Sequence, residues 1–241
     1  MKKLFYVIAL VLGLSLSAAA SPGKSPSASA GNSIVTKTVE LVAFDKIIAK
    51  GKFDIKYVQG EQNVKVCGPE ASIKKLKFEV SAGVLTIDAG KSTFLRDDLV
   101  IFICTPELKS VRIEGAGDFE AKQGIKTRDL SLNISGAGDI EVKNLDAEDV
   151  KISINGAGDI DVEYMLCESI DVVINGAGDV DLEDIDCNDF SANINGAGSA
   201  DVSGHAREAR LVLNGAGSID VSKLSCDNLN SKINGMGKIK R

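Results

Sequence analysis

The sequence predicts an all-β solenoid, a fold in which the chain winds into stacked coils of short strands. A phrase returns at a nearly fixed period, as "INGAGDIDVE" from Ile154 and "INGAGDVDLE" from Ile174. Apolar and polar residues alternate on both sides of this phrase, and a pair of glycines lies between the two alternating runs. The first glycines are 19 to 21 residues apart, at Gly115, Gly136, Gly156, Gly176, Gly196, Gly215 and Gly235. This period indicates about seven coils of roughly 20 residues.

Each coil is expected to contain two short strands. Apolar residues recur two and four positions before the first glycine, and four and six positions after it. In the coil of Gly156 they are Ile152, Ile154, Ile160 and Val162. A period of two predicts half-buried strands, so these residues should form columns that point into the core.

The glycine phrase is interpreted as a corner of the fold. Glycine adopts positive φ at no steric cost and lets two backbones approach closely. The residues before the first glycine can hydrogen-bond along the stack through their amides; they are Asn155, Asn175, Asn195, Asn214 and Asn234. A dinucleotide fingerprint needs a third glycine that opens a helix, and the calcium nonapeptide needs an acid where this phrase has an apolar residue. Both alternatives are therefore disfavoured.

The first residues indicate export. Residues 1–20 contain two lysines, a short apolar run and a final run of three alanines at 18–20, which predicts a cleavable signal peptide. Residues 21–33 are rich in Ser, Pro, Gly and Ala and are interpreted as a disordered leader. No cysteine follows the expected cleavage point and no later apolar run reaches the length of a membrane span. The mature protein is predicted to be exported to the periplasm, the outer surface or the medium, without a lipid anchor or transmembrane segment.

The mature chain is divided into two regions. Residues 111–241 are predicted to form the solenoid, and residues 34–110 an irregular N-terminal β region that serves as a cap or as degenerate coils. "AKGKFDIKYV" at residues 49–58 resembles "IEGAGDFEAK" at residues 113–122. Residues 111–241 carry 13 Lys and Arg against 24 Asp and Glu, so nucleic acid is not an expected partner.

Acids form two outward columns. The first contains Asp118, Asp139, Asp159 and Asp179, and continues with Ser199, Ser218 and Lys238. The second contains Glu120, Glu141, Asp161, Asp181, Asp201 and Asp220, and ends at Lys240. The metal candidates are Asp159, Asp161, Asp179 and Asp181, whose carboxylates could bind calcium between coils. A solvated stripe that keeps the stack soluble is the preferred interpretation. The lysines and Arg241 at the last coil would blunt that end against another stack.

Catalytic and cofactor chemistry is not expected. The acid pair recurs from coil to coil, which marks a position of the fold, and His205 is the only histidine. Cys167, Cys187 and Cys226 fall at the same place in their coils and are predicted to be buried free thiols. The cysteine spacing contains no zinc-binding pattern.

Three passages carry a resemblance to a known family. They are "FDKIIAKGKFDIKYVQG" at residues 44–60, "LVIFICTPELKSVRIEGAGDF" at residues 99–119 and the repeated "INGAGDI" phrase. The chain resembles the head GIN domain family of auto-transporter adhesins, which are exported bacterial envelope proteins. The resemblance implies a right-handed β-helix-like fold and a role in adhesion, and it brings no catalytic or ligand residues.

The first functional hypothesis is a non-catalytic envelope or surface protein, an adhesin that presents a solenoid face to a surface protein or glycan. A parallel β-helix enzyme that acts on polysaccharides is the second hypothesis, and an aromatic groove with one unrepeated acid pair would favour it. A calcium-stabilised structural module is the third.

Overall fold

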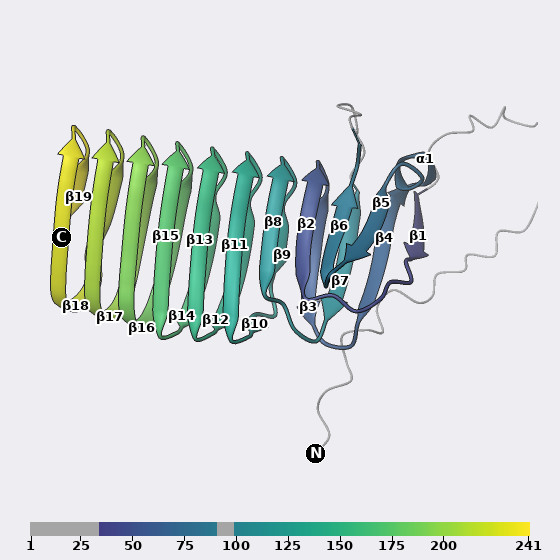
Figure 1. Ribbon diagram of the computed structural model, residues 1–241, viewed down its shortest axis with the longest axis horizontal. Coiled ribbons are helices and arrows are strands. Elements are labelled where there is room, and N and C mark those ends of the chain that lie inside the picture. Colours follow the sequence, from purple (N-terminus) through teal and green to yellow (C-terminus); the bar gives the residue numbers. More distant parts are fainter. Residues whose placement is uncertain (1–33, 91–98) are drawn as a thin grey trace, which may run out of the picture. The chain divides into compact units, whose positions relative to one another are not determined.

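The computed structural model describes residues 34–90 and 99–241, which form a β-solenoid of about seven turns. Figure 1 shows the coils side by side, with the cap strands at one end and the last coil at the other. The predicted all-β solenoid is confirmed. The predicted signal peptide at residues 1–20 and leader at residues 21–33 lie outside the described residues.

One strip of the solenoid contains the strands that lead into the glycine corner. Neighbouring strands are hydrogen-bonded, and all are parallel except β5 and β6. In spatial order they are β5 (Lys77–Ser81), β6 (Val84–Asp88), β2 (Lys46–Gly51), β8 (Ser110–Gly115), β11 (Asp129–Gly136), β13 (Asp149–Gly156), β15 (Ser169–Gly176), and then the second halves of β16 (Asp179–Gly196), β17 (Ser199–Gly215) and β18 (Ser218–Gly235).

A second strip contains the strands that leave the corner. Only its outermost pairs, β1 with β4 and β4 with β7, are antiparallel. In spatial order they are β1 (Ile34–Thr38), β4 (Asn63–Pro69), β7 (Val100–Thr105), β3 (Asp54–Gln59), β9 (Phe119–Ala121), β12 (Ile140–Asp146), β14 (Ile160–Leu166), the first halves of β16, β17 and β18, and β19 (Lys238–Lys240). The short β10 (Ile125–Lys126) pairs with the end of β12.

The columns seen in the sequence are neighbours in the strand register. Ile134, Ile154, Ile174 and Ile194 are opposite one another on successive strands, and each is 0% exposed. Each of these side chains is covered by the coil before it and the coil after it. The predicted inward columns are therefore confirmed.

The glycine corner is required by the close approach of the coils. Gly156 has a φ of 153°, and a Cβ atom placed on it would lie 2.1 Å from the carbonyl oxygen of Gly136. The next coil repeats this contact between Gly176 and Gly156. The structural role of the glycines is confirmed.

The predicted asparagine ladder is also confirmed. The Nδ2 group of Asn175 donates a hydrogen bond to Oδ1 of Asn155 at 3.0 Å, and that of Asn195 donates to Asn175 at 2.9 Å. Asn214 and Asn234 continue the ladder, each at 2.8 Å. Because an amide can both donate and accept, the column links five successive coils beside the glycines.

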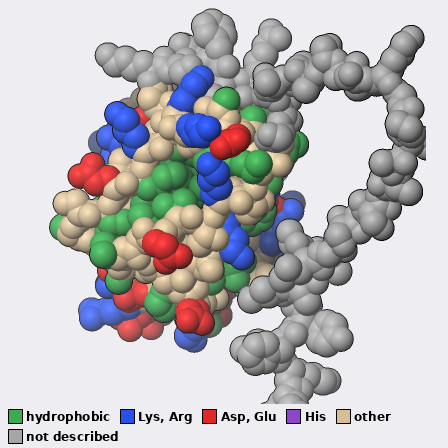
Figure 2. Space-filling view, turned by 90° about the vertical axis from the view of Figure 1, so that its right-hand side faces the viewer, with side chains coloured by type: hydrophobic (Ala, Val, Ile, Leu, Met, Phe, Trp, Pro, Cys, Tyr) green, Lys and Arg blue, Asp and Glu red, His purple; other side chains and the backbone are tan. Residues whose placement is uncertain are grey.

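The first coil lies between the cap and the regular coils. It consists of β2 and β3; Gly51 is opposite Gly115, and Ile55 is opposite Phe119. The strands β1, β4, β5, β6 and β7 lie on its other side, together with the four-residue helix α1 (Glu70–Ile73), and form the cap. Figure 2 views this end, where hydrophobic side chains gather near the centre among lysines and arginines. Within the described residues no helix is long and apolar enough to cross a membrane.

The three repeated cysteines occupy one column but are not equally buried. Cys167 and Cys187 are buried, whereas Cys226 is only half-buried, so the expectation of a buried thiol is wrong for Cys226. The reason is its place in the last coil, which has a neighbour on one side only. A hydrogen bond with the Cys187 thiol, together with burial, raises the pKa of Cys167.

Candidate functional site

A third side of the solenoid is formed by β10, by the last three residues of β12 and of β14, and by residues 184–186 of β16. The middle residues point inward and are buried, and the residues on either side point outward. The buried residues are Ile125, Leu145, Met165 and Ile185, which are opposite one another in register. The outward residues before and after the buried one therefore form two rows, and in the coil of Ile125 the residue of the first row is Gln123, because Gly124 is buried.

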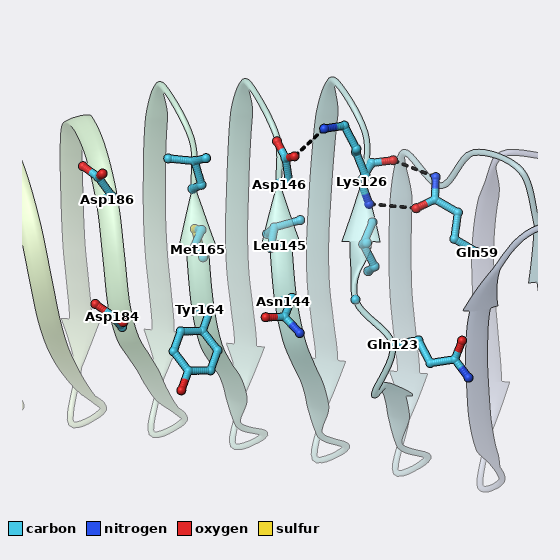
Figure 3. A pocket seen from close by; sticks show the side chains of 13 residues that line it. Gln59, Gln123, Lys126, Asn144, Leu145, Asp146, Tyr164, Met165, Asp184 and Asp186 are labelled. Atoms are coloured by element: carbon cyan, nitrogen blue, oxygen red, sulfur yellow. Dashed lines mark hydrogen bonds and ion pairs between the residues drawn. The ribbon is translucent and has the colours of Figure 1, made fainter. Parts of the chain in front are cut away.

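These rows line a groove of about 640 Å³. Figure 3 shows Gln123, Asn144, Tyr164 and Asp184 in one row, and Lys126, Asp146 and Asp186 in the other. The residues come from four successive coils, so the groove runs along the stack and across the strands.

Gln59 of β3 closes one end of the groove. Its Nε2 group donates to the carbonyl oxygens of Lys126 at 2.7 Å and Pro106 at 2.9 Å, and its Oε1 atom accepts from the Lys126 backbone N–H at 2.8 Å. The Lys126 ammonium is in turn 2.5 Å from Oδ2 of Asp146. This end is therefore fixed by hydrogen bonds, and the charge of Asp146 is paired.

The middle of the groove presents two large side chains to solvent. Tyr164 is 50% exposed and Leu166 is 57% exposed. Asn144 lies next to Tyr164 in register, and Asp186 lies next to Leu166. An aromatic ring with amides and carboxylates around it can stack on a sugar or hold a polypeptide side chain while hydrogen-bonding its polar groups.

The far end of the groove is acidic. Among the coils that line the groove, only the coil of Asp184 and Asp186 has an acid in both rows. Neither acid forms an ion pair in the described part of the chain. Asp184 has a φ of 46°, and its backbone N–H donates to Oγ of Ser203 at 3.3 Å. The strand register shifts between Leu182 and Ile185, so this coil departs from the regular pattern.

The structure places His205 between Asp186 and Ser225 on adjacent strands. These residue types can form an acyl-transfer triad, but catalysis requires hydrogen bonds that link base, orienting acid and nucleophile. Within residues 34–90 and 99–241 no hydrogen bond joins His205 to either neighbour, and all three residues are exposed. The column is therefore not an assembled triad.

The first acid column has a structural use that the sequence did not suggest. Oδ1 of Asp159 accepts the backbone N–H of Asp179 at 3.1 Å, and Oδ1 of Asp139 accepts that of Asp159 at 3.3 Å. Oδ1 of Asp179 accepts from the backbone N–H and the hydroxyl of Ser199, at 2.9 and 2.6 Å. These carboxylates connect successive coils, so they are more than a solvated stripe.

The second acid column is where like charges accumulate. Burial raises the pKa of Asp161, and the neighbouring Asp181, Asp159 and Asp139 raise it further. Burial and then Glu183 raise the pKa of Asp181. Glu120 at the start of the column differs, because it forms ion pairs with Lys56 and Lys122.

The four metal candidates are therefore distributed over two columns, and Asp161 is opposite Asp181 in register. In the described ranges, no three His, Cys, Asp or Glu side chains are grouped closely enough to hold a metal ion. Calcium binding by Asp159, Asp161, Asp179 and Asp181 stays a hypothesis from the sequence.

Replacing Asp161 and Asp181 by asparagine is expected to raise the melting temperature at neutral pH. The pKa values of Asp161 and Asp181 are raised in the folded state, so their protonated carboxyl groups favour folding below pH 3.8, the usual pKa. This contribution to stability is lost as the pH rises through the raised pKa values. The gain of the variant should thus appear above about pH 4 and shrink in high salt. Thermal melts from about pH 3 to 8 measure it.

Asp220→Asn is the matched control with the opposite sign. Hydrogen bonds from Lys240 and Ser222 lower the pKa of Asp220. The ionised carboxylate of Asp220 therefore stabilises the fold above pH 3.8, and this stability is lost as the pH falls through the lowered pKa. This variant should melt lower than the wild type at neutral pH. A wild-type melting temperature that climbs with micromolar calcium, while the Asp161→Asn, Asp181→Asn variant does not respond, would instead support the cation site.

The stacked coils place the protein in the class of β-solenoids. The chain belongs to the family described as "Putative auto-transporter adhesin, head GIN domain", whose model matches it at residues 43–163 and again at residues 163–240. The two consecutive matches cover nearly all of the described residues. The family resemblance seen in the sequence is therefore confirmed.

Solved structures share the fold at low sequence identity. A "putative adhesin" from Bacteroides fragilis is 22% identical with a TM-score of 0.76, and the match covers 86% of this chain and 96% of that one. A "putative adhesin" from Parabacteroides merdae is also 22% identical, with a TM-score of 0.65, and the match covers 86% of this chain and 95% of that one. A "putative lipid binding protein" from Parabacteroides distasonis is 18% identical, with a TM-score of 0.67, and the match covers 86% of this chain and 96% of that one. The comparison with curated proteins gave no match.

Proposed function

We propose that the protein is an exported, non-catalytic surface binding module, an adhesin that holds a glycan or a surface protein in the groove around Tyr164. The observation that carries the proposal is the exposure of Tyr164 and Leu166 in the middle of a groove otherwise lined by amides and carboxylates. Tyrosine is one of the three residue types that contribute most of the binding energy at interfaces. The adhesin family supports a surface role.

Export is part of the proposal and rests on the sequence of residues 1–20. The absence of a lipid anchor rests on the lack of a cysteine at the expected cleavage point. The groove would then face partners outside the cytoplasm, where glycans and surface proteins are available.

The proposal is tested by binding to arrays of glycans and extracellular-matrix proteins, with and without calcium. We expect the wild type to bind at least one class of partner, and Tyr164→Ala to weaken that binding at least about tenfold, because truncation of a central aromatic residue costs about 2 kcal/mol or more. Phe102→Ala is the matched control. Phe102 is 47% exposed on β7, outside the groove, so its truncation should leave binding unchanged.

Two results would contradict the proposal. Equal binding by the Tyr164→Ala variant and the wild type would place the contact elsewhere on the solenoid. Binding that requires calcium and is lost with Asp161→Asn and Asp181→Asn would shift the function to the acid columns.

A polysaccharide-acting enzyme is the second candidate, and one observation favours it. The pair Asp184 and Asp186 is not repeated in the groove rows of other coils, and it lies next to the single aromatic residue of the groove. Glycoside hydrolysis uses two carboxyl groups that flank the bond to be cleaved. Release of reducing ends from a polysaccharide panel, lost in Asp184→Asn, Asp186→Asn but retained in Asp161→Asn, Asp181→Asn, would establish this activity.

A further inference from the structure

The C-terminal end of the stack is an open strand edge. On one side β18 pairs with β17 along almost its whole length, and on the other side it pairs with β19 only at residues 218–220. In the described part of the chain, residues 221–235 and β19 have no strand partner on their outer side. Figure 1 shows this edge opposite the capped end. Such an edge presents backbone donors and acceptors that can pair with another strand.

The apolar columns of the core are uncovered at this edge. Ile194 and Leu213 are 0% exposed, whereas Ile233, the next residue of the same column, is 45% exposed. Leu224 and Leu229 are half-buried, and Met236 is 92% exposed at the corner where other coils have alanine. The last coil thus lacks the apolar cover that every inner coil receives from its neighbour.

The charge of the edge is opposite to that of the coils before it. The first acid column ends at Lys238 and the second at Lys240. The ammonium of Lys240 is 2.8 Å from Oδ2 of Asp220, the acid of the preceding coil in the same column. An ammonium can bind two carboxylates, as Lys109 does with Asp45 at 2.8 Å and Glu107 at 3.0 Å. A further acid could therefore approach Lys240 from the open side.

A second copy of this chain does not complement this edge. Two C-terminal edges would bring lysines against lysines, and like charges at strand spacing repel. The opposite end is closed by the cap, whose β4, β5 and α1 region carries exposed lysines of its own; these are Lys65, Lys74, Lys75 and Lys77. The complementary occupant is a strand in which apolar residues alternate with acids.

We propose that the edge formed by β18 and β19 binds, by strand addition, a segment of another protein that consists of two short strands joined at a glycine corner and in which apolar residues alternate with Asp or Glu. The backbone of the segment would pair with β18 and β19, its apolar side chains would cover Ile233 and Leu229, and its acids would meet Lys238 and Lys240. Strand addition takes its affinity from the backbone and its specificity from alternate side chains. The surface is distinct from the groove, so the inference goes beyond the proposed function.

A peptide of residues 169–186 provides the probe, because it contains one acidic coil of this protein and no cysteine. In its own coil Asp179 and Asp181 occupy the columns that end at Lys238 and Lys240. A second peptide carries Asp179→Lys and Asp181→Lys. Fluorescence anisotropy with labelled peptides and the purified protein measures both affinities. We expect the acidic peptide to bind at least about tenfold more tightly, and less tightly as salt is added.

Protein variants test where the peptide binds. Lys238→Glu with Lys240→Glu should reverse the preference between the two peptides, and Ile233→Asp should weaken both. Lys143→Glu with Lys151→Glu is the control, because it makes the same change of net charge at exposed residues of inner coils and should leave the preference unchanged. Each variant is checked by circular dichroism for an intact fold.

Three outcomes would overturn the proposal. Equal binding of the two peptides, or no binding, would mean that the lysines only blunt the end of the stack. Concentration-dependent dimers in sedimentation, abolished by Ile233→Asp, would mean that a second copy covers the edge. Binding to phosphatidylglycerol vesicles that depends on Lys238 and Lys240, without peptide binding, would identify an anionic membrane surface as the partner.

Discussion

Replacing both Ile154 and Ile174 by aspartate is expected to leave the solenoid unfolded at room temperature. Both side chains are 0% exposed and lie opposite each other in the core. Each new carboxylate would be buried without a partner, at an effective cost of several kcal/mol per charge. Two such charges cost about 8 kcal/mol, comparable to the total stability of about 5–15 kcal/mol of a typical domain. Far-UV circular dichroism and thermal melts measure the loss.

Lys151→Asp is the control for this prediction, because it introduces an aspartate on the outer face of the strand that contains Ile154. Lys151 is exposed, and its neighbour in register on the next strand is Asp171. The new like-charge pair should lower stability by at most about 1 kcal/mol. A double isoleucine variant with a retained β signal and an unshifted melting curve would contradict the role assigned to the inward columns.

Gly176→Ala is expected to destabilise the protein by about 2–6 kcal/mol. The new Cβ atom would lie 2.1 Å from the carbonyl oxygen of Gly156, and the backbone of Gly176 has a φ of 147° that other residues rarely adopt. Overpacking costs about 1–3 kcal/mol, and a strained backbone adds about 1–3 kcal/mol. Because the clash is with backbone, the two coils must separate, which weakens the 2.9 Å hydrogen bond from Ala177 N–H to the Gly156 carbonyl. Denaturant unfolding measures the change.

Ala177→Ser is the matched control, because Ala177 lies between the two glycines of the corner and is exposed. It should leave the free energy of unfolding within about 0.5 kcal/mol of the wild type. A Gly176→Ala variant as stable as this control would mean that the coils can separate at the corner without cost. That result would contradict the role assigned to the close contact between Gly176 and Gly156.

The sequence predicts the repeated part of the fold well because each repeat confirms the same pattern. The inward isoleucines, the glycine corner and the asparagine ladder all follow from side-chain size, φ preference or hydrogen-bonding capacity, which are properties of single residue types. Repetition over successive coils makes such a pattern visible without any knowledge of the tertiary structure.

The groove could not be predicted in the same way, because it depends on departures from the repeat. Tyr164 and Leu166 occupy positions where other coils have polar residues, and only the register shows that Tyr164 lies beside Asn144 and Leu166 beside Asp186. Gln59 closes the groove from a strand that is 67 residues from Lys126 in the sequence. The one signal in the sequence that could locate the site is the pair of large side chains at Tyr164 and Leu166, because the neighbouring coils have polar residues at these two positions.

The two acid columns also look alike in the sequence but differ in the structure. Asp159 and Asp179 accept backbone hydrogen bonds from the following coil, whereas Asp161 and Asp181 face each other as like charges. The direction in which each carboxylate points decides this difference. Alternation alone cannot supply that direction.

The regular coils are able to fold before the first coil and its cap. Regular coils connect residues about 20 positions apart, as in the bond between Asn175 and Asn155, whereas Gln59 and Lys126 are joined across 67 positions. Short chain closures form faster than long ones, because less chain entropy is lost before the contact is made. The regular coils can therefore assemble first and provide a template, and the first coil with its cap docks onto them later.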